Sequence, residues 1–134
     1  MAGYSGTPLI KKLGIKPGMS VCILNAPESY DVTLGALPDA VQRHTALKGE
    51  LDFIHFFTKS KAEFEKHYPN LKQHLAKGGM VWVSWPKRAS KVVTDMTEDV
   101  VRNFALANGL VDVKVAAIDE VWSGLKLVYR LKDR

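Results

Sequence analysis

The feature that most constrains the fold of this chain is an unbroken apolar run, Met80–Trp85, which follows a double glycine and precedes the basic segment Pro86–Lys91. A strand that is apolar at successive positions is typical of a parallel sheet, in which helices cover both faces. Two further segments are nearly as apolar, Ser20–Asn25 and Leu51–Thr58. These strands predict a mostly parallel sheet, with Met80–Trp85 as a central strand that leads to cations at one edge.

Segments with helical patterns separate these strands. The expected helices cover 8–13, 30–37, a segment that starts at Ser60, and 98–107. Thr7 is expected to cap the first helix, and Ser60 with Glu63 has the spacing of a capping box. Pro69 falls inside the third helical pattern and predicts a kink or two shorter helices there. Gly78-Gly79 is expected to end this segment immediately before the next strand.

The C-terminal part of the chain has a different pattern. Val111–Ile118 and Leu125–Leu131 alternate apolar and polar residues, and the short link between them suits an antiparallel hairpin. Val41–Leu47 alternates weakly and is expected at an edge of the sheet. This order predicts an α/β three-layer sandwich with a mostly parallel, Rossmann-like sheet that ends in an antiparallel hairpin. The length of 134 residues is typical of a single domain, 1–134, with a flexible lead-in at 1–6.

The composition limits the classes of partner. The formal net charge of +5 favours an anionic partner, although the lysines and arginines fall into small scattered groups. Nucleic-acid binding through these basic patches is therefore only the third hypothesis. The single cysteine, Cys22, excludes a disulfide framework, and the four histidines lack metal-ligand spacing, so no metal site is expected. No segment has the pattern of a membrane span or a signal peptide, which predicts the cytoplasm.

Short motifs along the chain resemble two groups of proteins. The chain resembles class I S-adenosylmethionine-dependent methyltransferases, with about one strand-helix unit fewer. That resemblance rests on Ile15–Gly18, Leu51–Ile54, Leu75–Gly79 and the terminal hairpin. Nearly the whole chain is also similar to a family of small bacterial proteins described as a domain of unknown function. The motifs shared with it are Gly3–Leu9, Leu24–Pro27, Val83–Lys87 and Trp122–Lys126. The resemblance implies a methyltransferase-like fold and no established activity.

The resemblance to methyltransferases also implies where a cofactor would bind, and the sequence departs from the pattern at both places. Methyltransferases follow the first strand with a glycine-rich turn, whereas this chain has Asn25–Ser29, without glycine. They end the second strand in an acid that holds the ribose, whereas this chain has Ala46-Leu47, and Glu50 lies beyond Gly49. We therefore expect no cofactor. A divergent S-adenosylmethionine-dependent transferase is the alternative hypothesis.

Ligands of open α/β sheets bind beyond the carboxyl ends of the strands. The candidate ligand-binding residues at this edge are Asn25, Glu28, Thr58, Ser84, Trp85 and Lys87. Lys87, with Arg88 or Lys91 nearby, is suited to pair with a phosphate or carboxylate, and Trp85 offers a flat apolar face. The alternative is that Trp85 packs against a helix while the cations face water.

Trp122 and Lys126, in and after the predicted hairpin turn, are candidate partner-binding residues. Trp122 is either an exposed anchor for another protein or a side chain that covers the end of the core. His55 interrupts an apolar strand and is expected to be a core residue with one hydrogen bond. The leading hypothesis is a non-catalytic domain, with no catalytic residue, that binds a small anionic ligand or a protein partner near Trp85 and Lys87. Self-association through the hairpin is a further hypothesis.

Overall fold

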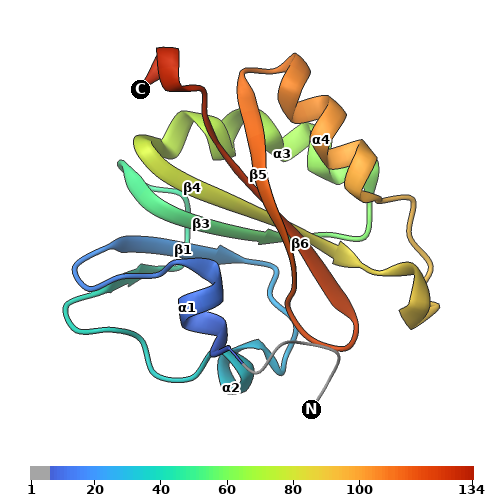
Figure 1. Ribbon diagram of the computed structural model, residues 1–134, viewed down its shortest axis with the longest axis horizontal. Helices are drawn as coiled ribbons and strands as arrows, with labels where there is room; N and C mark the ends of the chain where they lie inside the picture. Colours follow the sequence, from blue (N-terminus) through green and yellow to red (C-terminus); the bar gives the residue numbers. More distant parts are fainter. Residues whose placement is uncertain (1–6) are drawn as a thin grey trace.

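The structure is a computed structural model that describes residues 7–134; the predicted lead-in at 1–6 lies outside the described residues. One six-stranded sheet has helices on both faces (Figure 1). The strands are β1 (Ser20–Leu24), β2 (Gln42–His44), β3 (Leu51–Phe57), β4 (Leu75–Pro86), β5 (Leu110–Ala117) and β6 (Trp122–Tyr129). The helices are α1 (Leu9–Leu13), α2 (Tyr30–Leu34), α3 (Lys61–His74) and α4 (Glu98–Ala107), with short 3-10 helices η1 (Arg88–Ser90) and η2 (Leu131–Asp133).

The strand order across the sheet is β2-β1-β3-β4-β6-β5. The first four strands in this order pair in parallel, and β6 runs antiparallel to both β4 and β5. This arrangement confirms the mostly parallel α/β sheet with an antiparallel hairpin. It also confirms that the weak strand within 41–47 is an edge strand, since β2 pairs only with β1.

Two hydrophobic cores lie on the two faces of the sheet, and each has its own pair of helices. Helices α3 and α4 cover one face through Phe64, Leu71 and Val101. Helices α1 and α2 cover the other face through Leu13 and Tyr30. Because β3 and β4 are buried on both faces, their nearly continuous apolar sequences are what a central strand requires.

The boundaries of the helices differ from the sequence expectation in two places. Pro8, not Thr7, occupies the N-cap position of α1, and the proline side chain makes no capping hydrogen bond. Pro69 lies inside one continuous helix, α3, so the predicted division into two helices is wrong. The exposed proline faces away from the core, while Tyr68 beside it is buried and its hydroxyl donates to the Asn108 carbonyl at 3.1 Å. Buried contacts thus hold the helix together across a residue that lacks an N–H.

Strand β4 begins at Leu75, five residues before the predicted start at Met80. Leu75 pairs with Leu51, and the next recorded pair, Met80 with Phe53, follows an irregularity in the register. The extra residues of β4 bring Gly79 against the backbone of β3. A Cβ atom at Gly79 would lie 2.9 Å from the Asp52 carbonyl oxygen. Gly79 therefore permits close approach of two strands, and the double glycine does not end the preceding helix.

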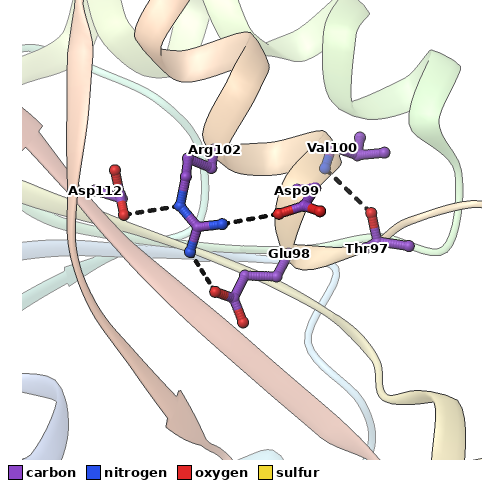
Figure 2. Close-up of polar contacts among 6 residues, drawn as sticks. All are labelled: Thr97, Glu98, Asp99, Val100, Arg102 and Asp112. Carbon is purple, nitrogen blue, oxygen red and sulfur yellow. Dashed lines mark hydrogen bonds and ion pairs between the residues drawn. The ribbon is translucent and has the colours of Figure 1, made fainter.

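Besides its buried apolar contacts, helix α4 is joined to the sheet by one arginine. Thr97 caps the helix, because its hydroxyl accepts from the Val100 N–H at 3.1 Å. Arg102 pairs with Glu98 and Asp99 on its own helix and donates to Asp112 on β5 at 3.0 Å (Figure 2). The guanidinium is thereby surrounded by three carboxylates, of which the Asp112 pair joins the helix to the outer hairpin strand.

The close approach at Gly79 gives a matched pair of substitutions. Gly79→Ala should lower the free energy of unfolding by about 1–3 kcal/mol, since the new methyl group meets rigid backbone atoms. Gly78→Ala should change it by less than about 0.5 kcal/mol, because a Cβ there meets nothing within 4 Å. Urea denaturation measures both. Equal effects of the two substitutions would contradict this explanation of the double glycine.

Candidate functional site

The strand order reverses between β1 and β3, because β2 lies on one side of β1 and β3 on the other. A pocket of about 610 Å³ lies at the carboxyl ends of these two strands. Its lining residues are Asn25, Pro27, Phe57, Thr58, Lys59, Ser60, Glu63, Val92, Val121 and Trp122. Open α/β sheets bind ligands at such a reversal, and the volume falls within the range of small-molecule sites. We call this cavity the edge pocket.

Asn25 forms the exit of β1 into the edge pocket. Its backbone has φ of 59°, in the left-handed region that asparagine and glycine tolerate best. The side chain is exposed, and the following residues lead into α2. The turn after β1 therefore adopts a conformation that usually calls for glycine, although the sequence has none there. The missing glycines, which argued against a cofactor, do not by themselves remove the sharp turn.

Thr58 and Glu63 are hydrogen-bonded polar residues in the lining of the edge pocket. The Thr58 hydroxyl donates to the Glu63 carboxylate at 2.6 Å and accepts from the Ser60 N–H at 3.1 Å. The Ser60 hydroxyl in turn accepts from the Glu63 N–H at 3.1 Å, as an N-cap should. Only half of the predicted capping box forms, because Glu63 bonds to Thr58 and not to the N–H of Ser60. Its carboxylate is consequently held at the pocket.

Two aromatic side chains supply the apolar part of the edge pocket. Phe57 and Trp122 pack edge to face, with ring centroids 5.2 Å apart. The Asp119 carboxylate accepts from the backbone N–H of Trp122 at 2.7 Å and so fixes the hairpin turn. Trp122 is only 9% exposed, so the interpretation of an exposed anchor is wrong and the indole covers the end of the core. A partner-binding role for the partly buried Lys126 stays a prediction.

Ser84 belongs to a buried string of hydrogen bonds and does not line the edge pocket. The Tyr30 hydroxyl lies 2.8 Å from Nδ1 of His55, and the Ser84 hydroxyl lies 2.7 Å from Nε2. All three side chains are at most 1% exposed. His55 therefore has two hydrogen-bond partners where the sequence predicted one. The string joins α2, β3 and β4 inside the protein, where a substrate cannot reach the serine.

The remaining predicted ligand residues do not gather at the edge pocket. Trp85 is 5% exposed and packs in the core beneath α4, as the alternative interpretation expected. It also lines a second pocket, of about 390 Å³, together with Arg88 and Lys91. Neither Lys87 nor the exposed Glu28 is among the lining residues of the two pockets. Of the six predicted residues, Asn25 and Thr58 meet in one cavity.

Several residues that line the edge pocket were not among the predicted site residues. The sequence predicts Glu63 only as a capping residue, whereas its carboxylate, in the first turn of α3, accepts from Thr58. Phe57 is a core residue, as the sequence predicts, and it also borders the pocket. Val121 and Trp122 reach the pocket through the antiparallel pairing of β6 with β4, in which Trp122 lies opposite Pro86. Local sequence carries no signal for this long-range contact.

Residues 7–134 contain no recognisable arrangement for metal binding, and their single cysteine is buried. No cluster of three or more histidine, cysteine, aspartate or glutamate side chains there is arranged to hold a metal ion. Cys22 is fully buried, and burial raises the pKa of its thiol. Within the same residues, no helix has the length and apolar character needed to cross a membrane.

The arrangement of strands and the position of the edge pocket define a Rossmann-like fold of the methyltransferase type. No protein-family model matches the sequence, and a search of curated proteins finds no match. Solved structures of methyltransferases do match the fold. Magnesium protoporphyrin IX methyltransferase from Synechocystis PCC 6803, with bound S-adenosylmethionine, aligns with a TM-score of 0.63 and 14% identity, over 91% of this chain and 74% of that one.

Two further structures give the same result. N-methyltransferase NodS from Bradyrhizobium japonicum WM9 aligns with a TM-score of 0.59 and 12% identity, over 92% of this chain and 98% of that one. An S-adenosylmethionine-dependent methyltransferase from Aquifex aeolicus aligns with a TM-score of 0.58 and 15% identity, over 92% of this chain and 89% of that one. At these identities the likeness establishes the fold. The methyltransferase-like fold that the sequence motifs implied is thereby confirmed.

The buried histidine predicts a pH dependence of stability. Burial lowers the pKa of His55 from 6.5 to about 3, so the unfolded chain binds a proton between these values that the folded protein does not. Stability should therefore fall as the pH drops from about 6.5 toward 3, by up to about 1.4 kcal/mol for each pH unit from this one group. His55→Gln should lose that part of the slope. An unchanged slope in this variant, measured by urea denaturation across the window, would contradict the assignment.

Proposed function

We propose that this protein binds S-adenosylmethionine in the edge pocket and acts as a divergent transferase that uses it. The observation that carries the proposal is the position of the pocket, at the reversal of strand order between β1 and β3. The fold likeness to methyltransferases, one of them with bound S-adenosylmethionine, supports the same ligand. This was the alternative hypothesis from sequence, and the retained turn at Asn25 removes one of the two arguments against it.

The lining residues match the chemical groups of that cofactor. Trp122, 9% exposed, is suited to contact a purine through the edge of its ring that borders the pocket, and Phe57, 1% exposed, packs behind it. The Glu63 carboxylate, bonded to Thr58 through one oxygen, is suited to accept from ribose hydroxyls or from the cofactor's ammonium group. Lys59 is exposed at the rim and is suited to pair with the cofactor's carboxylate. Asn25 adds an amide that both donates and accepts.

One departure from the methyltransferase pattern remains. Strand β2 ends at His44 and the loop after it has exposed residues, among them Glu50, which does not line the edge pocket. The carboxylate of the pocket comes instead from Glu63 at the start of α3. If the cofactor binds, its hydroxyl groups are therefore held from the β3 side and not from the β2 side. This difference is why we describe the transferase as divergent.

When bound, S-adenosylmethionine supplies a methyl group on a positively charged sulfur, which a nucleophile can accept directly. The protein's own task in such a reaction is mainly to hold two reactants in line and to exclude water. The buried aromatic floor, the carboxylate of Glu63 and the turn at Asn25 are suited to orient one reactant. The acceptor would enter from the solvent side of the pocket, next to Lys59 and Val92.

Isothermal calorimetry with S-adenosylmethionine and S-adenosylhomocysteine tests the proposal. Glu63→Gln should weaken binding at least tenfold, because it removes the charge while its amide oxygen can still accept from Thr58. Glu65→Gln, on the same helix but outside the pocket lining, should leave binding within about twofold. No heat of binding in the unmodified protein, or equal effects of the two substitutions, would reject the proposal.

Asn25→Gly separates the side chain from the turn. Glycine tolerates the left-handed conformation at this position, so the turn should persist while the amide group is lost. If the amide contacts the cofactor, affinity falls about three- to tenfold; if only the backbone matters, it stays unchanged. Asn25→Ala, which strains the turn as well, should be the weaker binder of the two.

A second candidate function is non-catalytic binding of a small anion at the pocket beside Trp85. The observation in its favour is that Arg88 and Lys91 line this cavity together, as the leading sequence hypothesis expected for the basic loop. Glu98 also lines it, and its carboxylate is paired with Arg102. The site therefore has two cations whose partners would come from a ligand carrying phosphate or carboxylate groups.

Arg88→Gln combined with Lys91→Gln tests this candidate. The double variant should bind inorganic phosphate at least tenfold more weakly than the unmodified protein and should fold normally, because both side chains are exposed. Trp85→Ala is unsuitable as a probe, since it would remove a core side chain and cost about 3–5 kcal/mol of stability. Phosphate binding that is unaltered in the double variant would eliminate the candidate.

A further inference from the structure

Two lysines lie directly opposite each other in the C-terminal hairpin. Lys114 of β5 pairs in register with Lys126 of β6, so their side chains leave the same face of the sheet as neighbours. Like charges in this position repel and destabilise a hairpin. Burial, followed by the charges of Lys114 and Lys16, lowers the pKa of Lys126. The hairpin thus contains a pair of cations that lowers its stability relative to a neutral pair at the same positions.

Helix α1 adds further cations to the same face. The Lys12 amine donates to the Ala117 carbonyl of β5 at 3.0 Å, and the Lys114 amine donates to the Lys12 carbonyl at 3.2 Å. Burial and then the charges of Lys114 and Lys87 lower the pKa of Lys12. Register and hydrogen bonds bring Lys12, Lys114 and Lys126 together, and the charges of Lys16 and Lys87 act on this group. We call Lys12, Lys114 and Lys126, with the flanking Lys16 and Lys87, the lysine patch.

Two of the three acids of the hairpin have partners away from the lysine pair, and the third, Glu120, is exposed in the turn. Asp112 pairs with Arg102 on the opposite face, and the Asp119 carboxylate accepts two backbone N–H groups of the turn. None of the ion pairs among the described residues involves Lys114 or Lys126. Since mutual repulsion persists at this place, a polyanion that brings several negative charges would relieve it.

The backbone of one lysine in the patch lies next to the edge pocket. The backbone N–H of Lys87 donates to the Val121 carbonyl at 2.8 Å, and Val121 lines the pocket. Val115, the exposed apolar neighbour of Lys114, points to the other face of the sheet, so it does not give the patch the apolar side chains that insertion into a lipid surface requires.

From this arrangement we infer that the lysine patch binds the phosphate backbone of a nucleic acid, without reading its sequence, across α1 and the β5–β6 hairpin. Amines on a helix and two strands present several cations along one surface, which suits regularly spaced phosphates. This inference goes beyond the proposed cofactor binding and does not depend on it. It also assigns a function to lysines that are far apart in the sequence.

Fluorescence anisotropy with a labelled polyuridine strand of about 20 nucleotides tests the inference. If three to five phosphates are neutralised, the logarithm of the association constant should fall with the logarithm of salt concentration with a slope of roughly −2 to −3.5. Lys114→Gln with Lys126→Gln should weaken binding at least tenfold and reduce the magnitude of that slope by about 1.4. Lys66→Gln with Lys132→Gln, exposed lysines outside the patch, removes the same charge and should change binding less than about twofold.

Two measurements keep the result interpretable. Circular dichroism should show that Lys114→Gln with Lys126→Gln is folded, and Lys16→Gln with Lys87→Gln provides a second pair that should also weaken polyuridine binding. Calorimetry with S-adenosylhomocysteine on the same variants should give unchanged affinity, so failure of one proposal is distinguishable from failure of the other. Equal loss in the patch and control variants, a flat salt response, or binding to anionic phospholipid vesicles without binding to polyuridine would overturn the inference.

Discussion

Every polar atom on the central strand β3 must find a partner inside the protein, because both faces of the strand are buried. His55 meets this requirement through Tyr30 on α2 and Ser84 on β4. Its ring also stacks on Phe57, with centroids 4.1 Å apart. These hydrogen bonds tie β3 to α2 and to β4, directly behind the strand end that lines the edge pocket. Without it, a histidine in this position would cost several kcal/mol in desolvation.

The edge pocket follows from the same central position of β3. Since β3 lies between β1 and β4, its carboxyl end meets the turn after β1 on one side and the hairpin that pairs with β4 on the other. Phe57 therefore contacts Trp122, while Thr58 holds Glu63 at the pocket lining. The polar and apolar halves of the cavity come from different parts of the chain, which the sheet brings together. A site of this kind depends on the register of three strands.

The sequence predicted those parts of the fold that depend on local pattern. Apolar runs identified β1 and β3, and alternation identified the hairpin. The predicted start of β4 was wrong because it depends on contacts with β3. Leu75 pairs with that strand and Gly79 packs against its backbone, and neither contact has a signal in the neighbouring sequence. The strand-end rule predicts Asn25 and Thr58 at one edge of the sheet from the parallel topology alone, and both line the edge pocket; their role as ligand residues stays a prediction.

The chemistry of the site was harder to predict, because it depends on which of several available partners a side chain chooses. Glu63 has the spacing of a capping box, but its carboxylate accepts from the Thr58 hydroxyl. This hydrogen bond holds the carboxylate at the pocket lining. Ser84 follows a strand pattern that suggested an exposed end, yet it faces His55. Repulsion between Lys114 and Lys126 was invisible in sequence because the two residues become neighbours only through the hairpin register.

We propose the edge pocket between β1 and β3 as the ligand site of this methyltransferase-like protein. Titration of the ¹⁵N-labelled protein with S-adenosylhomocysteine, followed through its backbone amide resonances, would locate the bound ligand. Binding in the edge pocket predicts the largest shifts at Asn25, Thr58 and Glu63, which line the cavity from three parts of the chain. Saturable shifts confined to Arg88 and Lys91 at the second pocket, or no shifts at all, would contradict it.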